Sequence, residues 1–280
     1  PERSVLGLMP AYVPGCGALG TKLVAVFNSN AARGLPTHAA TILLMHHETG
    51  ELVAIMDGSY ITEARTAAVS TLAVRCLAKQ PVRRLALFGA GVQARSHVRA
   101  IAANIATLED VRVWSPSESR TTFASAMSAE LRVRCAAPES AKATAEGADL
   151  VVLVTSSPEP VLQRAWVAPG ALVVSAGACR RDHREVDPAL VADAQVFVDS
   201  RAAALVESGD IVQGIAEHRF SAEHIQGELG EVLLGRVTVR SAEDDIVVFK
   251  SLGLAVEDVT AADVAYRRAL AFGIGIDLEL

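Results

Sequence analysis

The chain has 280 residues, of which 51% are hydrophobic and 21% charged, and its net charge at pH 7 is −6. This length predicts a large core and two lobes, and an acidic chain without a basic stripe argues against a nucleic-acid-binding surface. No apolar run reaches the ~18–20 residues that span a membrane, and no signal peptide is recognised, so we expect a cytoplasmic protein. The four cysteines are scattered without metal-ligand spacing, which is typical of free thiols and predicts no metal site.

The first lobe reads as antiparallel sheet. We expect three strands here, at 22–27, 41–45 and 51–56. The last two flank a turn at 48–50, which is typical of a hairpin. From Thr62, a plausible N-cap, an alanine-rich pattern predicts a helix over 64–77. Gln80-Pro81 ends this segment, and we place the lobe boundary there.

After Pro81 strands and helices alternate, which predicts an α/β domain with a parallel sheet covered by helices on both faces. The expected strands are 84–88, 110–114, 131–135, 149–155, 171–175, 195–199 and 246–249, and the expected helices are 92–106, 118–129, 139–146, 188–192 and 255–272. The last helix is expected to return to the first lobe. The expected domains are therefore 1–80 with 254–280, and 81–253.

A glycine-rich turn follows the expected strand at 84–88. Gly89, Gly91 and Ala94 fit the dinucleotide fingerprint G-x-G-x-x-G/A between a strand and a helix. The backbone N–H groups at the start of that helix, including those of Val92 and Gln93, would face a pyrophosphate. An ordinary tight turn is the alternative interpretation.

The choice of nucleotide depends on the end of the strand at 110–114. No acidic residue stands there to hold the ribose 2′-hydroxyl of NAD, and Ser115, Ser117 and Arg120 could contact a 2′-phosphate, so NADP(H) is favoured over NAD(H). The alternative is that these residues only begin the next helix. Thr155 and Ser156 end another strand and are expected to approach the cofactor, because ligands lie outside the carboxyl ends of parallel strands.

Further motifs give the chain a family resemblance. They are Gly7-Leu8-Met9-Pro10-Ala11-Tyr12, Thr21-Lys22-Leu23-Val24, Met56-Asp57-Gly58, Arg65-Thr66-Ala67-Ala68-Val69-Ser70, Glu207-Ser208-Gly209-Asp210, Glu228-Leu229-Gly230-Glu231 and Phe249-Lys250-Ser251-Leu252-Gly253. With these the chain resembles the ornithine cyclodeaminase/mu-crystallin family, and its mu-crystallin (ketimine reductase) branch more than the cyclodeaminases. The resemblance implies a Rossmann domain joined to a smaller discontinuous α+β dimerisation domain, a site in the cleft between them, and a homodimer. It also implies a further N-terminal segment with a carboxylate-binding arginine, which we expect to precede Pro1.

Two cations are the candidate catalytic residues. Arg65 stands near the start of a helix, where a cation is electrostatically misplaced unless an anion binds it, and its planar fork suits a carboxylate. The resemblance implies that Lys22 lies in the substrate site, where desolvation would lower its pKa and let it donate a proton. The alternatives are a surface arginine and a strand-end lysine. The resemblance also implies a cofactor contact for Thr66, and His38 is a candidate substrate contact with a structural histidine as its alternative.

The residue at position 179, a cysteine, helps to distinguish a cyclodeaminase from a ketimine reductase. The resemblance implies a catalytic aspartate at this position in cyclodeaminases, and a thiol does not replace a carboxylate as general base unless its pKa is lowered. We expect Cys179 to line the substrate site, with a small packing residue as the alternative. The resemblance to the ketimine reductase branch implies that the chain reduces cyclic ketimines, such as Δ1-piperideine-2-carboxylate or Δ1-pyrroline-2-carboxylate, to cyclic L-amino acids with NAD(P)H. Three alternatives stay open: ornithine cyclodeaminase, an alanine-dehydrogenase-like activity on a 2-oxo acid, and non-catalytic NADPH-dependent binding of a small ligand of the thyroid-hormone type.

Overall fold

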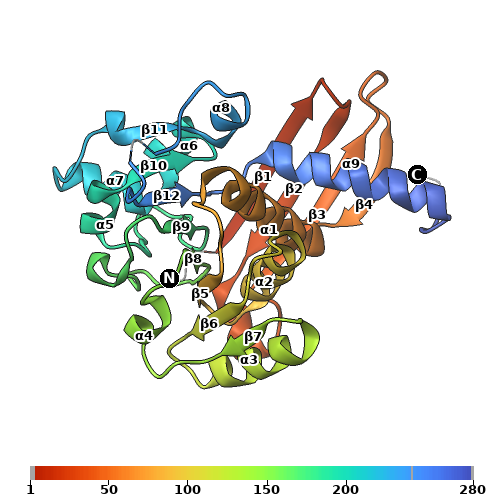
Figure 1. Cartoon of the computed structure of the whole chain (residues 1–280). Helices are drawn as coiled ribbons and strands as arrows, with labels where there is room; N and C mark the ends of the chain where they lie inside the picture. The colour runs from red at the N-terminus through yellow and green to blue at the C-terminus, as the bar shows by residue number, and fades with distance from the viewer. Residues whose placement is uncertain (1–3, 241, 279–280) are drawn as a thin grey trace. The chain divides into compact units, whose positions relative to one another are not determined.

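The computed structural model describes residues 4–240 and 242–278 and divides the chain into two compact units (Figure 1). One unit runs to Arg65 and resumes at Leu254, and the other is Thr66–Gly253. The second boundary follows Gly253, and the first lies inside helix α1 (Gly58–Leu77). The reason is that the distal half of α1, with Val74 and Leu77, is buried in the core of the second unit.

The first unit is a four-stranded antiparallel sheet with a long helix across one face. The strands lie in the order β1-β2-β3-β4 and are β1 (Val5–Val13), β2 (Ala18–Val26), β3 (His38–Met45) and β4 (Leu52–Asp57), with a 3-10 helix η1 (Asn28–Arg33) between β2 and β3. Helix α9 (Ala255–Phe272) packs against β1, β2 and β3, so it returns to this unit as the sequence predicts. Ile42, Val259 and Ala262 are fully buried between sheet and helix.

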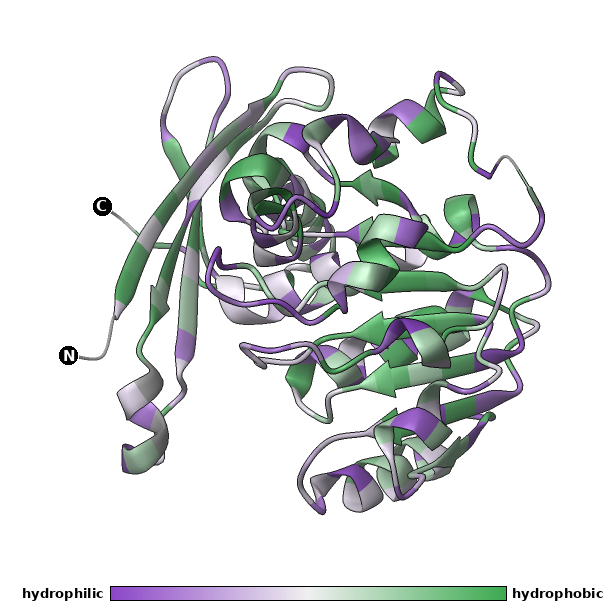
Figure 2. Ribbon diagram, turned by 90° about the vertical axis from the view of Figure 1, so that its left-hand side faces the viewer, coloured by the Kyte–Doolittle hydropathy of each residue, from purple (hydrophilic) through white to green (hydrophobic). Residues whose placement is uncertain are grey.

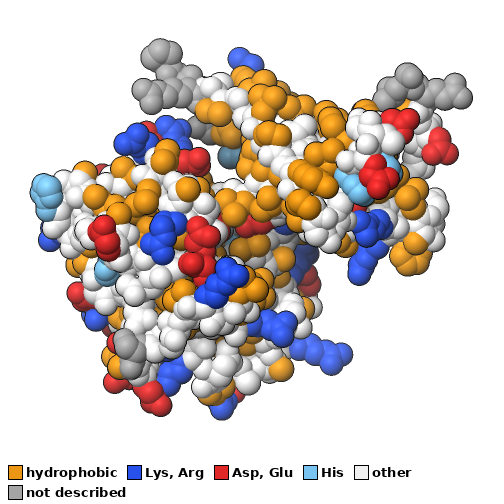
Figure 3. Space-filling model, turned by 90° about the horizontal axis from the view of Figure 1, so that it is seen from above, with side chains coloured by type: hydrophobic (Ala, Val, Ile, Leu, Met, Phe, Trp, Pro, Cys, Tyr) orange, Lys and Arg blue, Asp and Glu red, His pale blue; other side chains and the backbone are white. Residues whose placement is uncertain are grey.

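The opposite face of this sheet is apolar and exposed. The register pairs Leu8 with Leu23 and Leu43 with Ile55, and side chains of paired residues share one face. Leu6, Leu8 and Ile55 are 66%, 67% and 52% exposed. Figure 3 shows a band of hydrophobic side chains on the surface of the molecule. An apolar area of this kind on a folded chain indicates an interaction surface.

The second unit is an eight-stranded parallel sheet in the order β11-β10-β12-β9-β8-β5-β6-β7. The strands are β5 (Arg84–Phe88), β6 (Asp110–Trp114), β7 (Arg134–Ala136), β8 (Leu150–Leu153), β9 (Leu172–Ser175), β10 (Gln195–Val198), β11 (Ile225–Glu228) and β12 (Val247–Lys250). The helices are α2 (Val92–Asn104), α3 (Ser119–Glu130), α4 (Ala141–Ala145), α5 (Pro188–Asp193), α6 (Arg201–Glu207), α7 (Gly209–Ala216) and α8 (Leu229–Leu233), with 3-10 helices η2 (Arg164–Trp166) and η3 (Ala222–His224).

Both faces of the parallel sheet are covered, as its sequence predicts. Leu85 and Leu87 of β5 pack into a cluster with residues of α1, α2 and α3, whereas Ala86 and Phe88 pack into a second cluster with residues of α5 and α7. The apolar strands of this sheet are green in Figure 2. The fold is therefore α/β with a parallel dinucleotide-type sheet. None of the helices in the described part of the chain is long and apolar enough to cross a membrane.

The start of α1 differs from the prediction. Asp57 Oδ1 accepts a hydrogen bond from Ser59 N at 2.8 Å, so an aspartate side chain caps a helix that begins at Gly58. Thr62, expected as the N-cap, lies inside the helix and donates its hydroxyl to Gly58 O at 2.7 Å.

Candidate functional site

The turn from β5 to α2 has the geometry that a pyrophosphate requires. Gly89 has a φ of 115°, and a Cβ there would lie 2.8 Å from Val154 O, so only glycine fits. A Cβ at Gly91 would meet nothing within 4 Å, which leaves the backbone open to a ligand. Gly91 is the N-cap of α2 without a side-chain cap, so the N–H groups of the following residues, Val92 and Gln93 among them, face outward from the helix terminus.

The turn after β6 brings together the three residues expected to contact the nucleotide phosphate. Arg120 Nη1 donates to Ser115 O at 3.2 Å and to Ser117 O at 3.1 Å. Arg120 also forms an ion pair of 3.2 Å with Glu118, which is 87% exposed. The three residues thus lie close together, and Glu118 competes for the guanidinium of Arg120.

Two buried polar atoms beside these turns fit an absent nucleotide. Among the described residues, Gln93 Oε1 and Arg120 Nε are buried and have no hydrogen-bond partner. Buried polar atoms are normally paired, so an unpaired acceptor in the first turn of α2 and an unpaired donor in the first turn of α3 are suited to a polar ligand. The residues present thus fit a dinucleotide.

Thr155 and Ser156 lie at the end of β8, as expected, but Thr155 is occupied. Its N–H and hydroxyl donate to Glu185 Oε1 at 2.7 and 2.8 Å. The second carboxylate oxygen accepts from Gly177 N at 2.8 Å and Ala178 N at 3.0 Å. The fully buried Glu185 therefore joins the loops after β8 and β9, while Ser156 is exposed.

Glu185 belongs to a buried charged network that the sequence did not reveal. Lys250 Nζ donates to Ala178 O at 2.6 Å and forms an ion pair of 3.0 Å with Asp210. Asp210 in turn accepts from Glu185 N at 2.9 Å. Burial lowers the pKa of Lys250, but the charges of Asp210, Cys179 and Glu185 outweigh it, so the pKa of Lys250 is raised and the ammonium is stable.

Cys179 follows this network on the exposed surface. It is a free cysteine whose Sγ lies 3.7 Å from Ala176 O. Its charge is one of the causes that raise the pKa of Lys250.

In the first unit, a single carboxylate holds both candidate catalytic cations. Lys22 Nζ lies 2.6 Å from Asp258 Oδ2, and Arg65 Nε lies 2.8 Å from Asp258 Oδ1. Arg65 Nη1 also pairs with Glu257 at 2.8 Å. Lys22 and Arg65 are 2% and 8% exposed, and Asp258 is fully buried. Burial lowers the pKa of Lys22 below its ordinary value.

The candidate substrate contact His38 and the candidate cofactor contact Thr66 lie on β3 and α1. His38 is exposed at the start of β3, with Nδ1 3.1 Å from Thr37 Oγ1, and its register partner is Val26, four positions along β2 from Lys22. Thr66 is buried on α1 directly after Arg65.

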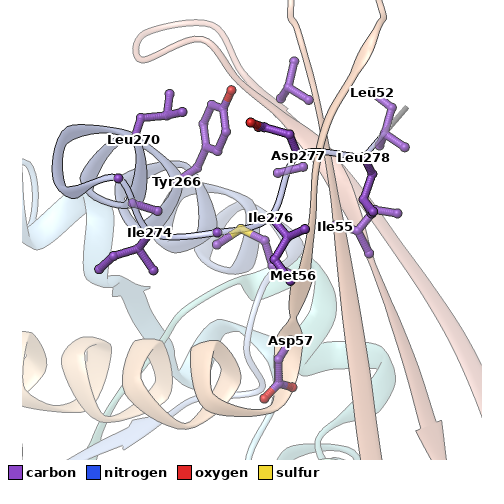
Figure 4. Close-up of a pocket in the computed structure, with 15 residues that line it drawn as sticks. Leu52, Ile55, Met56, Asp57, Tyr266, Leu270, Ile274, Ile276, Asp277 and Leu278 are labelled. Carbon is purple, nitrogen blue, oxygen red and sulfur yellow. The ribbon is translucent and has the colours of Figure 1, made fainter. Parts of the chain in front are cut away.

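A groove of about 690 Å³ lies elsewhere in the first unit (Figure 4). It lies between β4 and the end of α9, and is lined by Ile55, Met56, Leu270, Ile274 and Ile276 among others. Lys22 and Arg65 do not line it, so the groove is separate from the cation pair.

The parallel sheet and the glycine-rich turn between β5 and α2 define a Rossmann-type dinucleotide-binding protein, which also has a second unit built on an antiparallel sheet. The model of the ornithine cyclodeaminase/mu-crystallin family matches residues 1–272, and the chain belongs to this family. It is 41% identical over 266 residues to the mouse protein named ketimine reductase mu-crystallin, covering 95% of this chain and 80% of that protein.

Solved structures of related proteins share the fold, and two of them show how close the likeness is. A Thermococcus litoralis Δ1-pyrroline-2-carboxylate reductase in complex with NADH and L-proline is 35% identical with a TM-score of 0.95, covering 98% of this chain and 85% of that one. An archaeal alanine dehydrogenase dimer with bound NAD is 28% identical with a TM-score of 0.93, covering all of this chain and 85% of that one.

Proposed function

We propose that the chain reduces the C=N bond of small cyclic ketimines that carry a carboxylate, such as Δ1-pyrroline-2-carboxylate and Δ1-piperideine-2-carboxylate, to cyclic L-amino acids with NAD(P)H. The observation that carries this proposal is the pair of buried cations, Lys22 and Arg65, held on Asp258. The names of the mouse and Thermococcus relatives support the same chemistry.

Each cation has a distinct task in this reaction. A bound nicotinamide supplies the hydride that the imine carbon receives. Asp258 and Glu257 engage Nε and Nη1 of Arg65 and fix the guanidinium plane, and we assign Nη2 to the substrate carboxylate. The Lys22 ammonium keeps the imine nitrogen protonated, and the burial that lowers its pKa makes it a better proton donor than an exposed lysine.

For the cofactor we propose NADP(H) ahead of NAD(H). The support is the Arg120 guanidinium, which lies beside Ser115 and Ser117 at the end of β6. Arginine binds phosphate with two parallel hydrogen bonds, which suits a ribose 2′-phosphate.

Reductive amination of a 2-oxo acid is the second candidate function. The observation that favours it is the TM-score of 0.93 with the archaeal alanine dehydrogenase. Ornithine cyclodeamination is disfavoured because position 179 is a cysteine instead of a carboxylate.

One substrate panel tests the proposal. NADPH and NADH oxidation is followed with both cyclic imines, with pyruvate and ammonia, and with ornithine. We expect rapid oxidation with a cyclic imine, and a loss of about 10²–10⁴-fold in kcat/KM for Lys22→Met, as is typical when a general acid is removed. The control is Lys79→Met, at a half-exposed lysine of the second unit, which should leave kcat/KM unchanged. Turnover of pyruvate alone supports the second candidate, and tight ligand binding without any turnover contradicts an enzyme.

We also infer a homodimer in which a second copy covers the apolar sheet face of β1–β4. Its support is the exposure of Leu6, Leu8 and Ile55 on that face. The archaeal relative is described as a dimer.

A further inference from the structure

Asp258 stands at the centre of the charged cluster of the first unit. It lies in the first turn of α9, where the helix dipole favours a carboxylate. One of its oxygens lies 2.6 Å from Lys22 Nζ and the other 2.8 Å from Arg65 Nε.

The neighbouring strands give Lys22 apolar surroundings, and its charged neighbours come from two helices. Its partners in the neighbouring strands are Met9 in β1 and Ile42 in β3, neither of which titrates. The charged groups that face it are Arg65 from α1, and Asp258 and Glu257 from α9. Burial and the Arg65 charge lower the pKa of Lys22, and the two carboxylates raise it, so the carboxylates decide which form of the amine is held.

We propose that Asp258 is a positioning residue that keeps Lys22 in its ammonium form and holds it alongside Arg65. The inference rests on the proposed function, in which Lys22 serves as the proton donor. Without the Asp258 carboxylate, a buried ammonium beside a guanidinium would release its proton, because desolvation and like charge both disfavour it. Lys22 would then be neutral and unable to protonate an imine.

Glu257 provides a matched control one residue away. It carries the same charge in the same turn of α9 and also pairs with Arg65, at 2.8 Å, but it raises the pKa of Lys22 less than Asp258 does. Its side chain is 13% exposed, whereas that of Asp258 is fully buried. Asp258→Asn and Glu257→Gln therefore remove one charge each from Arg65, and Asp258→Asn also removes the carboxylate that lies 2.6 Å from Lys22 Nζ.

The first measurement is the titration of Lys22 in the folded protein by NMR of ¹³C-labelled lysine. The sequence has only four lysines (Lys22, Lys79, Lys142 and Lys250), and Lys22→Met assigns the resonance. We expect Asp258→Asn to lower the pKa of Lys22 by about 1–3 units, the usual effect of an opposite charge at this distance, and Glu257→Gln to change it much less. Equal shifts in the two variants, or none in Asp258→Asn, would overturn the proposal.

The second measurement is the pH profile of kcat/KM for a cyclic imine. A proton donor must be protonated, so activity falls above its pKa, and the alkaline limb of Asp258→Asn should move to lower pH by as much as the NMR titration does. A merely structural role would lower kcat/KM without moving the limb. If the titration moves while the limb stays, Asp258 controls Lys22 as proposed, and it is the role of Lys22 in the proposed function that fails.

Asp258→Glu keeps the experiment decisive should Asp258→Asn not fold. It retains the charge, so the Lys22 titration should stay close to that of the wild type. A drop as large as the one expected for Asn would contradict the proposal, because the charge would then not be what holds the proton.

Discussion

Ser70 and His97 join helices α1 and α2, with Ser70 Oγ 2.9 Å from His97 Nε2. His97 Nδ1 lies 2.7 Å from Gln93 O, which can only accept, so Nδ1 carries the proton and the Ser70 hydroxyl donates to Nε2. His97 is completely buried, and burial lowers its pKa to about 4. The helix that begins at the glycine-rich turn is thus tied to the helix that carries Arg65 by a neutral histidine.

The His97 contact predicts a loss of stability in mild acid. The folded-state pKa lies below the unfolded value of about 6.5, so the contribution is fully present above pH 6.5 and is lost as the pH falls toward 4. The loss should amount to roughly 3 kcal/mol in the free energy of unfolding, measured by urea titration at several pH values. His97→Gln should flatten this dependence, and the control His46→Gln, at an exposed histidine, should retain it. A steep dependence in His97→Gln would refute the assignment.

The two glycines of the turn should respond differently to alanine. Gly89→Ala forces a Cβ against Val154 O in a backbone conformation that suits glycine, so it should lower the free energy of unfolding by about 1–3 kcal/mol and also weaken NAD(P)H binding. Gly91→Ala meets no protein atom, so it should leave stability within about 0.5 kcal/mol and weaken only cofactor binding. Thermal melts and cofactor fluorescence titrations separate the two effects. Unchanged binding in Gly91→Ala would show that no phosphate approaches this backbone.

Cofactor choice should depend on Arg120 and Glu118. Arg120→Ala removes the charged hydrogen bonds to the 2′-phosphate, so it should raise the Kd for NADPH by at least about tenfold and leave the Kd for NADH nearly unchanged. Glu118→Gln releases Arg120 from its ion pair and should tighten NADPH binding. Calorimetric titrations measure the Kd of each variant for NADPH and for NADH. Equal effects of Arg120→Ala on the two nucleotides would exclude a 2′-phosphate contact.

The apolar sheet face should hold the dimer together. Leu8→Glu places a charge at a leucine that is 67% exposed on this face, and the protein should then elute as a monomer, with its mass measured by light scattering. Val206→Glu, at an exposed valine of α6 in the other unit, is the control and should stay dimeric. A wild type that is monomeric at all concentrations would refute the dimer.

The helices and strands that were predicted best are those with a clear hydrophobic pattern in their own sequence. Strands 84–88 and 110–114 and the helix 255–272 coincide with β5, β6 and α9, because a buried strand and a long amphipathic helix have clear local patterns. β11 (Ile225–Glu228) was not predicted, because Gln226 and Gly227 interrupt any apolar pattern and its position depends on pairing with β10. The start of α1 was misplaced because both Asp57 and Thr62 are good cap residues, and only the structure shows which one caps.

The candidate site was predictable only in part, for a similar reason. Lys22 and Arg65 were found from their residue type and from the family resemblance. Asp258, which holds both, lies 193 residues after Arg65 in the chain, and Glu185 lies 30 residues from its partner Thr155. No local periodicity connects such pairs, and a carboxylate in the first turn of a helix is common for electrostatic reasons alone.

The most direct test of the central claim follows the hydride itself. The protein is incubated with Δ1-pyrroline-2-carboxylate and NADPH that carries deuterium at C4 on the transferred side, and the product is analysed by mass spectrometry and NMR. We expect L-proline with one deuterium at the α-carbon and one NADPH oxidised per molecule formed. NADPH left unoxidised across the cyclic imines, or a product without the label, would contradict the account.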